Sequence, residues 1–171
     1  MTHDAAVLKA REIASRVLAP SAGQNDKSGR FSTEAVVSLG ESGLLGLMLP
    51  VHVGGLGLGP RTFAAVIATL AEADASVAMV YLMHIFGAAT ISAARPSATQ
   101  AVTPILQEIS AGRHLSTLAF SKAGSRSHFW EFLVEEAEHA MPVGDPNLRL
   151  SRRENSCDYP PPPYRLTVST R

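Results

Sequence analysis

The sequence predicts a mainly α-helical protein, with a helical domain over residues 1–112 followed by a partial β domain over residues 113–171. Two observations indicate this fold class. Apolar residues recur at helical spacing in successive segments as far as Ile109, and this periodicity ends at His114. The stretch LSTLAFS over residues 115–121 holds β-branched and aromatic residues without helical spacing, which is typical of a strand. We therefore expect a strand over residues 114–121.

The first predicted helix is defined by apolar residues that line one face at helical spacing: Ala10, Ile13, Ala14, Val17 and Leu18. We expect Pro20 to end this helix, because proline lacks a backbone N–H and its ring clashes with the preceding turn. The polar stretch SAGQNDKSGR over residues 21–30 is interpreted as a connection.

A short second helix is predicted through Leu39, with Phe31 and Val36 as a hydrophobic staple around Ser32 at its N-cap. Gly43 is the expected stop. The GGLGLG run at residues 54–59 predicts a tight, irregular loop. It does not follow a strand in a βαβ unit, so a packing loop is preferred over a dinucleotide-binding fingerprint.

A third helix is predicted to begin at Pro60, because a proline in the first turn of a helix loses no hydrogen bond. Its apolar stripe is formed by Phe63, Val66, Ile67 and Leu70.

The next segment, residues 75–94, carries no formal charge apart from what His84 can hold, and it has the length of a membrane span. Its polar residues and its many alanines favour a buried helix of a soluble protein instead. We expect either Asp74 or Ser76 to cap it and His84 to be a hydrogen-bonded core residue. The side chains expected to be buried on it are Met79, Met83, Phe86 and Ile91.

A last helix is predicted before Gly112, with Val102, Ile105, Leu106 and Ile109 on one face. Beyond about residue 131 the pattern is poorly specified, and the YPPPPY run at residues 159–164 must be extended because prolines have no ladder donors. We expect residues 131–164 to be loosely attached.

Composition excludes several function classes. Lysine plus arginine balance aspartate plus glutamate at 15 each, so no overall field favours nucleic acid. The single cysteine and the absence of a basic-then-apolar leader predict a reducing, cytoplasmic setting. The six histidines show no pair at metal-ligand spacing, so no metal site is expected.

Three segments together resemble the acyl-CoA dehydrogenase family: ESGLLGLMLPVHVGGLGLGP, FAAVIATLAEADASVAMVYLMH and AGRHLSTLAFSKAGSRSHFW. The resemblance covers residues 1 to about 130. It implies an amino-terminal helical domain that leads into a β-barrel-like middle domain, with a carboxyl-terminal four-helix domain completing the flavin site and the oligomer. It also implies FAD-dependent α,β-dehydrogenation of an acyl-CoA thioester, in which a glutamate removes the α-proton and an electron-transfer partner reoxidises the flavin.

The same resemblance implies a flavin-contacting stretch at residues 118–127. Ser121 takes the place of the hydroxyl residue that donates to the flavin edge, and Ser127 takes that of the serine near the pantetheine of the substrate. The backbone of Leu118, Ala119 and Phe120 would face the isoalloxazine ring, where N–H groups stabilise negative charge.

This chain departs from the family pattern at several positions. Lys122, Ala123 and His128 stand where the family commonly has Glu, Pro and Asp, which leaves the substrate class and the loop geometry open. A Trp-x-Thr motif and the catalytic glutamate have no counterpart, so no catalytic residue is assigned. These departures predict an inactive amino-terminal fragment, degenerate or frame-shifted after about residue 130.

Other functions remain open at this point. An acyl-CoA oxidase or a flavin monooxygenase shares the fold. A non-catalytic helical fragment or oligomerising module, and a one-span membrane protein, are the candidates from other classes. A homo-oligomer is expected for a complete family member.

Overall fold

The computed structural model describes residues 1–93, 99–118 and 165–169. They all belong to one compact unit, Met1–Leu118 with Pro163–Arg171. In chain order the elements are α1 (His3–Ile13), η1 (Ala14–Leu18), α2 (Ala19–Ser28), α3 (Thr33–Glu41), η2 (Leu44–Gly46), η3 (Val51–Val53), α4 (Pro60–Ala73), α5 (Ala75–Ser92), α6 (Thr99–Ser110), β1 (His114–Leu118) and β2 (Arg165–Ser169). The predicted mainly helical fold is confirmed.

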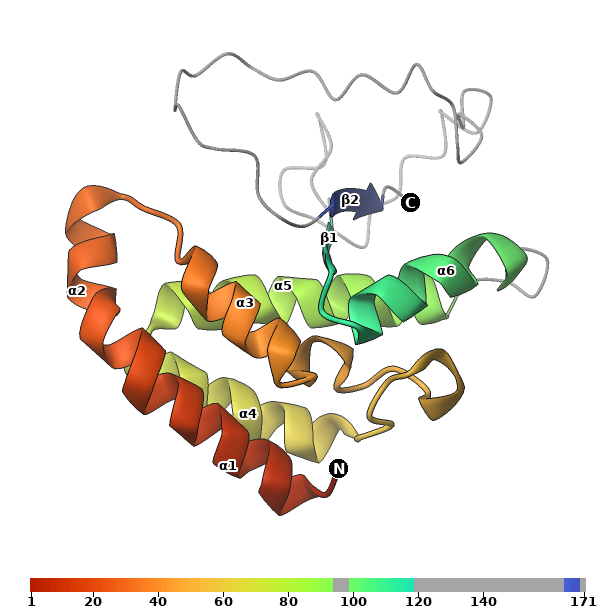
Figure 1. Cartoon of the computed structure of the whole chain (residues 1–171), viewed down its shortest axis with the longest axis horizontal. Coiled ribbons are helices and arrows are strands. Elements are labelled where there is room, and N and C mark those ends of the chain that lie inside the picture. The colour runs from red at the N-terminus through yellow and green to blue at the C-terminus, as the bar shows by residue number, and fades with distance from the viewer. Residues whose placement is uncertain (94–98, 119–164, 170–171) are drawn as a thin grey trace, which may run out of the picture. The chain divides into compact units, whose positions relative to one another are not determined.

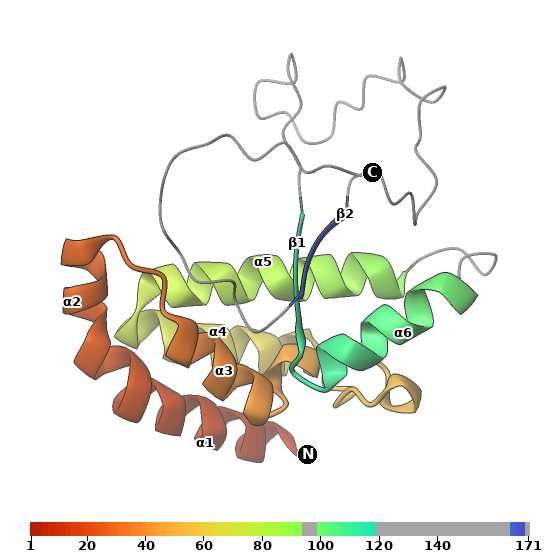
Figure 2. The ribbon, with the colours of Figure 1, turned by 45° about the horizontal axis from the view of Figure 1, so that its top comes forward.

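Helices α1, α4 and α5 lie side by side in the order α1, α4, α5 (Figure 1). Strand β1 crosses α5 at a steep angle, as Figure 2 shows, and α6 packs against both of them. Strands β1 and β2 pair in parallel, with His114 opposite Arg165 and Leu118 opposite Ser169. The predicted strand is therefore confirmed over residues 114–118, and the rest of it lies outside the described residues.

The expectation that Pro20 ends the first helix is wrong. The chain continues from α1 through η1, a π-helical turn, into α2, where Pro20 occupies the first turn. A π turn is wider than an α turn because its hydrogen bonds span five residues. It leaves room for a proline whose ring would clash with the carbonyl four residues earlier in an α-helix.

The polar stretch over residues 21–30 is also helical for most of its length, contrary to its interpretation as a connection. Helix α2 runs to Ser28 and ends at Gly29, whose φ of 63° lies in the left-handed region. None of the residues of α2 is buried, so it carries no apolar stripe that a periodic pattern could reveal.

The second predicted helix is confirmed as α3. Ser32 occupies the N-cap position, although its hydroxyl makes no capping hydrogen bond. The glycine run that follows α3 along the chain forms the expected packing loop. The amides of Leu56, Gly57 and Leu58 donate to carbonyls of residues 46–49 over 2.9–3.0 Å. A Cβ on Gly55 would overlap the Leu49 carbonyl, so the close return of the chain requires glycine there.

Helix α4 begins at Pro60 as predicted, and Val66 and Leu70 on its stripe are completely buried. Asp74 caps the next helix: its carboxylate accepts from the amides of Ser76 and Val77 at 2.9 and 3.0 Å. This confirms one of the two predicted caps.

Burial around α5 differs from the prediction. Ile91 is buried, but Met79 is 56% exposed, Phe86 is 43% exposed and Met83 is half-buried. The buried residues of α5 lie on the side that meets α4, α6, η2 and β1. Met79, Met83 and Phe86 follow one another at helical spacing, so α5 presents an apolar stripe that the rest of the described chain covers only in part. By length and composition α5 could cross a membrane, and 44% of it is buried.

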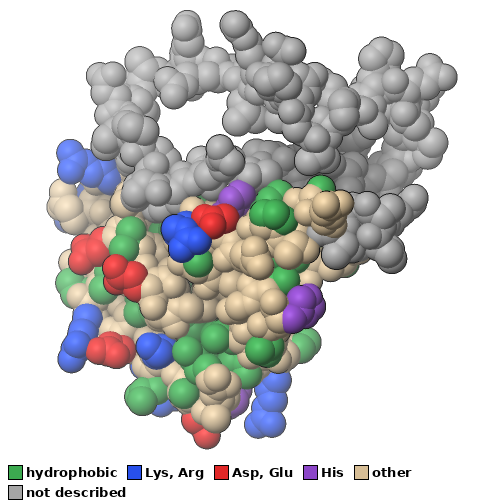
Figure 3. All heavy atoms as spheres, turned by 45° about the vertical axis from the view of Figure 1, so that its right-hand side comes forward, with side chains coloured by type: hydrophobic (Ala, Val, Ile, Leu, Met, Phe, Trp, Pro, Cys, Tyr) green, Lys and Arg blue, Asp and Glu red, His purple; other side chains and the backbone are tan. Residues whose placement is uncertain are grey.

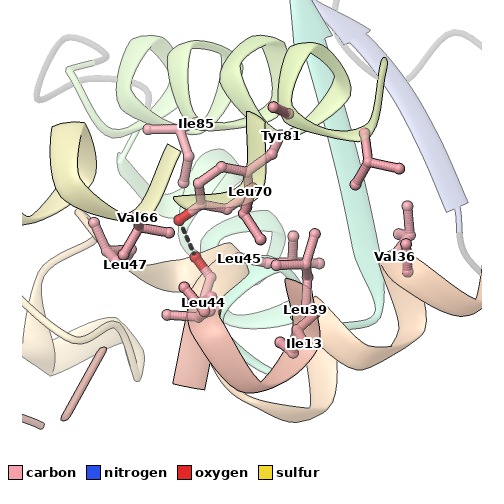
Figure 4. Close-up of a cluster of buried hydrophobic side chains, with 14 of the residues drawn as sticks. Ile13, Val36, Leu39, Leu44, Leu45, Leu47, Val66, Leu70, Tyr81 and Ile85 are labelled. Carbon is pink, nitrogen blue, oxygen red and sulfur yellow. Dashed lines mark hydrogen bonds between the residues drawn. The ribbon is translucent and has the colours of Figure 1, made fainter. Parts of the chain in front are cut away.

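The core is built from two clusters. The larger joins α1, η1, α3, η2, α4, α5 and β1, and Figure 4 shows its side chains converging between the helices. The smaller joins Leu49, and Val53 of η3, to α5 and α6, with Leu106 and Ile109 buried. The predicted face of α6 is thereby confirmed.

Candidate functional site

The candidate site begins where β1 lies across α5. The contact is made at Gly87: a Cβ placed there would lie 3.0 Å from the Ser116 Cβ and 3.1 Å from the Thr117 nitrogen. Glycine therefore lets the strand backbone rest directly on the helix. One helical turn earlier, His84 meets the same segment of β1.

His84 is completely buried and uses both ring nitrogens. The Ser116 amide donates to its Nδ1 at 2.9 Å, and its Nε2 lies 3.0 Å from the Leu45 carbonyl oxygen. An atom that accepts from an N–H carries no proton, and a carbonyl can only accept. The neutral Nε2–H tautomer is therefore the form that satisfies both partners.

Burial lowers the pKa of His84 to about 4, because the charged ring would lose its hydration. The bond to the Leu45 carbonyl raises this pKa and the nearby His114 lowers it, both by less than the burial effect. At neutral pH the ring is uncharged and available as an acceptor for β1.

Tyr81, one turn before His84, also joins α5 to η2. Its hydroxyl donates to the Leu44 carbonyl oxygen at 3.0 Å (Figure 4). Burial raises the pKa of this phenol, so it remains a donor. Tyr81 and His84 thus bind successive carbonyls of η2, and only His84 also binds β1.

The sequence-predicted site residues begin at the end of β1. Leu118 is its last residue and pairs with Ser169. Ala119, Phe120, Ser121 and Ser127 lie outside the described residues. The expectation that His84 is a hydrogen-bonded core residue is confirmed. Its partner Ser116, 32 positions away, was missed; a lone histidine three residues before a glycine was the available signal.

Charged side chains are interspersed over the face in Figure 3 and do not gather into one patch there. Two exposed ion pairs, Arg16–Glu12 at 2.8 Å and Arg113–Glu108 at 2.7 Å, join neighbours on or beside single helices. Exposed pairs of this kind contribute little to stability.

Comparison with known proteins decides the family. Residues 2–101, which include α1 to α5, match the family model described as "Acyl-CoA dehydrogenase, N-terminal domain". The chain belongs to the acyl-CoA dehydrogenase family. The resemblance stated from the sequence is thereby confirmed, and so is the identity of the helical domain.

Two relatives illustrate this membership of the acyl-CoA dehydrogenase family. The chain is 35% identical over 80 residues to the 3-sulfinopropanoyl-CoA desulfinase of Advenella mimigardefordensis, which is 47% of this chain and 20% of that protein. It is 32% identical over 85 residues to a protein of Mycobacterium tuberculosis named "probable acyl-CoA dehydrogenase", covering 50% of this chain and 22% of that protein. The match therefore spans about a fifth of each relative.

A solved structure shares the fold of this acyl-CoA dehydrogenase domain. It is described as the electron transferring flavoprotein of Acidaminococcus fermentans, in work on flavin-based electron bifurcation. The TM-score is 0.68 at 20% sequence identity, over 75% of this chain and 34% of that one. At this identity the likeness shows the fold alone.

Proposed function

We propose that the chain forms part of the flavin-binding wall of an acyl-CoA dehydrogenase, which catalyses FAD-dependent α,β-dehydrogenation of acyl-CoA thioesters. The observation that carries the proposal is the packing of β1 on α5 at Gly87, together with the hydrogen bond from Ser116 to His84. In a helical domain of this family, His84 and Gly87 hold the strand that leads directly into residues 118–127. That stretch is the one with the hydroxyl and backbone groups suited to a flavin.

The chemistry of β1 and its surroundings fits FAD. The isoalloxazine ring is uncharged, with polar edges that need N–H and O–H donors. The groups at the contact between β1 and α5 are neutral at pH 7. They are the backbone of Ser116 and Thr117 in β1 and the imidazole of His84 in α5. We propose that Leu118, Ala119 and Phe120 hold FAD through backbone groups.

Two serines complete the proposed site. The Ser121 hydroxyl would donate to the flavin edge, and Ser127 would lie near the pantetheine of the acyl-CoA. When bound, FAD supplies a hydride acceptor for the β-carbon of the substrate. The residues of this chain would orient the ring and exclude water from one side of it.

The wider assignments belong to the same proposal. They are a domain boundary near residue 112, an acyl-CoA substrate, an electron-transfer partner, assembly into a homo-oligomer and a cytoplasmic setting. The name of the desulfinase relative supports a CoA thioester as substrate, and the flavoprotein named in the solved structure supports flavin use.

Titration of the purified chain with FAD, followed by flavin fluorescence, tests the proposal. We expect saturable binding that Ser121→Ala weakens about tenfold, because one hydrogen bond to the ring is lost. Ser28→Ala is the matched control, since the Ser28 hydroxyl is exposed and bonds within α2. Absence of binding, or equal affinities for all three proteins, would refute the proposal.

A further inference from the structure

We propose that His84 is a positioning residue. Its neutral ring fixes the position of β1 and determines which edge of the strand faces away from β2, and it thereby orients the backbone of Leu118 towards the flavin. The inference rests on the proposed function for its last step. The step before it, that His84 holds β1, rests on contacts of described residues alone.

The first argument is that one ring joins three elements. His84 belongs to α5, its Nε2–H reaches η2 at Leu45, and its Nδ1 receives the amide of Ser116 in β1. Both bonds are made in a completely buried place, where water cannot replace either partner. Loss of the ring would therefore leave a buried N–H and a buried carbonyl unpaired.

The second argument concerns the edges of β1. In an extended strand the N–H and C=O of one residue point to the same edge, and those of the next residue to the opposite edge. Ser116 gives its N–H to His84 and so faces α5. Leu118 is two residues further on and shares the edge of Ser116, while β2 occupies the other edge.

Because the edges alternate, the hydrogen bond from Ser116 to His84 favours one register of β1. A slip of β1 by one residue would turn the peptide groups of Leu118 towards β2 and away from a ligand. Leu118 is one of the residues whose backbone is proposed to meet the ring.

Substitution of Gly87 tests the same contact between β1 and α5 independently of His84. It is three residues after His84 on α5, and its missing side chain makes room for Ser116 and Thr117. Gly87→Ala should push β1 away from α5 while leaving the imidazole in place. The two residues together form the seat of the strand.

The experiment compares four proteins of full chain length. His84→Leu removes both hydrogen bonds, whereas His84→Gln keeps one donor and one acceptor on a side chain of similar reach. Tyr81→Phe is the matched control, because it removes the neighbouring buried bond from α5 to η2 without touching β1. Wild type completes the set, and circular dichroism establishes that each variant retains its helices.

Two readouts are measured: hydrogen exchange of the Ser116 amide, and the dissociation constant for FAD. Relative to Tyr81→Phe, we expect His84→Leu to exchange about tenfold faster at Ser116 and to bind FAD about tenfold more weakly. His84→Gln should recover part of both. If His84→Leu behaves as Tyr81→Phe does in both readouts, the proposal is overturned.

The two readouts separate this inference from the proposed function. If wild type binds no FAD, the proposed function fails, and Ser116 exchange alone decides whether His84 holds β1. Fast exchange with unchanged FAD affinity overturns the link to the flavin. If His84→Leu does not fold, Gly87→Ala takes its place: weaker FAD binding supports the seat, and unchanged binding overturns it.

Discussion

At the scale of single residues, His84 makes stability depend on pH. Its pKa is about 4 in the folded protein, below the ordinary value of 6.5, because burial disfavours the charged ring. Between these two values the unfolded chain binds more protons than the folded one. The free energy of unfolding therefore rises with pH through this window, and the stability is fully present above about pH 6.5.

We predict that acidification from pH 7 to pH 4 removes roughly 3 kcal/mol through His84 alone. Urea unfolding at several pH values in this range measures the effect, and His84→Gln should show a flatter dependence than wild type. His52→Gln is the control, since His52 is exposed. The same pH dependence in all three proteins would show that His84 does not titrate in this way.

At the scale of elements, two glycines should respond to alanine with opposite signs. A Cβ on Gly40 in α3 would lie 2.9 Å from the carbonyl oxygen of Gly112, in the turn between α6 and β1. A Cβ on Gly23 in α2 would meet nothing within 4 Å. Alanine favours a helix equally at both positions, so only the contact distinguishes them.

We therefore predict that Gly40→Ala destabilises the protein by about 1–3 kcal/mol, because two backbones must move apart. Gly23→Ala should stabilise it by about 0.5–1 kcal/mol, through helix propensity alone. Thermal or urea unfolding of both variants measures the pair. Stabilisation by Gly40→Ala would mean that α3 and the turn at Gly112 can separate without penalty.

The sequence was sufficient for elements whose apolar residues repeat, such as α4 and α6, because core packing selects that repeat. It was insufficient at Pro20, since widening one turn changes backbone hydrogen bonds and leaves no mark on the pattern of side chains. Helix α2 was missed for a related reason: a helix that buries nothing has no stripe.

Predictions that depend on distant partners were weaker still. An apolar helix such as α5 does not reveal which side lacks a neighbour, so Met79 and Phe86 were wrongly expected in the core. His84 was expected to be hydrogen-bonded, but its partners are far away in the chain and follow from the fold. The candidate flavin residues came from the family resemblance, and of these only Leu118 lies within the described residues.

At the scale of the whole molecule, the proposed chemistry requires more than a flavin wall. Removal of the α-proton needs a base within hydrogen-bond reach of it, while the β-carbon is held beside the flavin. Within the described residues, four glutamates are exposed on helices, and the fifth, half-buried Glu108, is bound to Arg113. None of them is buried as a tuned catalytic base usually is.

We predict that the chain with FAD does not oxidise acyl-CoA at a useful rate. Purified protein, acyl-CoA of several chain lengths and an artificial electron acceptor provide the assay. A complete acyl-CoA dehydrogenase in the same assay is the positive control. Turnover by this chain that Ser121→Ala abolishes would show that a base is present after all.

The π turn in η1 also makes this region tolerant of a change in chain length. A π turn is equivalent to an α-helix with one residue inserted, so removal of exposed Arg16 should restore regular winding provided that Pro20 is replaced. Ala14 and Leu18 would then be three residues apart and still share a face. Helix α2 would keep its orientation about the helix axis, because the π turn already absorbs the additional residue.

Deletion of Arg16 together with Pro20→Ala should therefore keep cooperative unfolding close to that of wild type. Deletion of Lys9, which is also exposed but lies in α1, should abolish it by turning buried Ala6 out of the core. Equal losses in the two proteins would contradict this. In an alignment of homologous chains, a one-residue gap should accordingly be found at residues 14–18 and in no other turn of this helix.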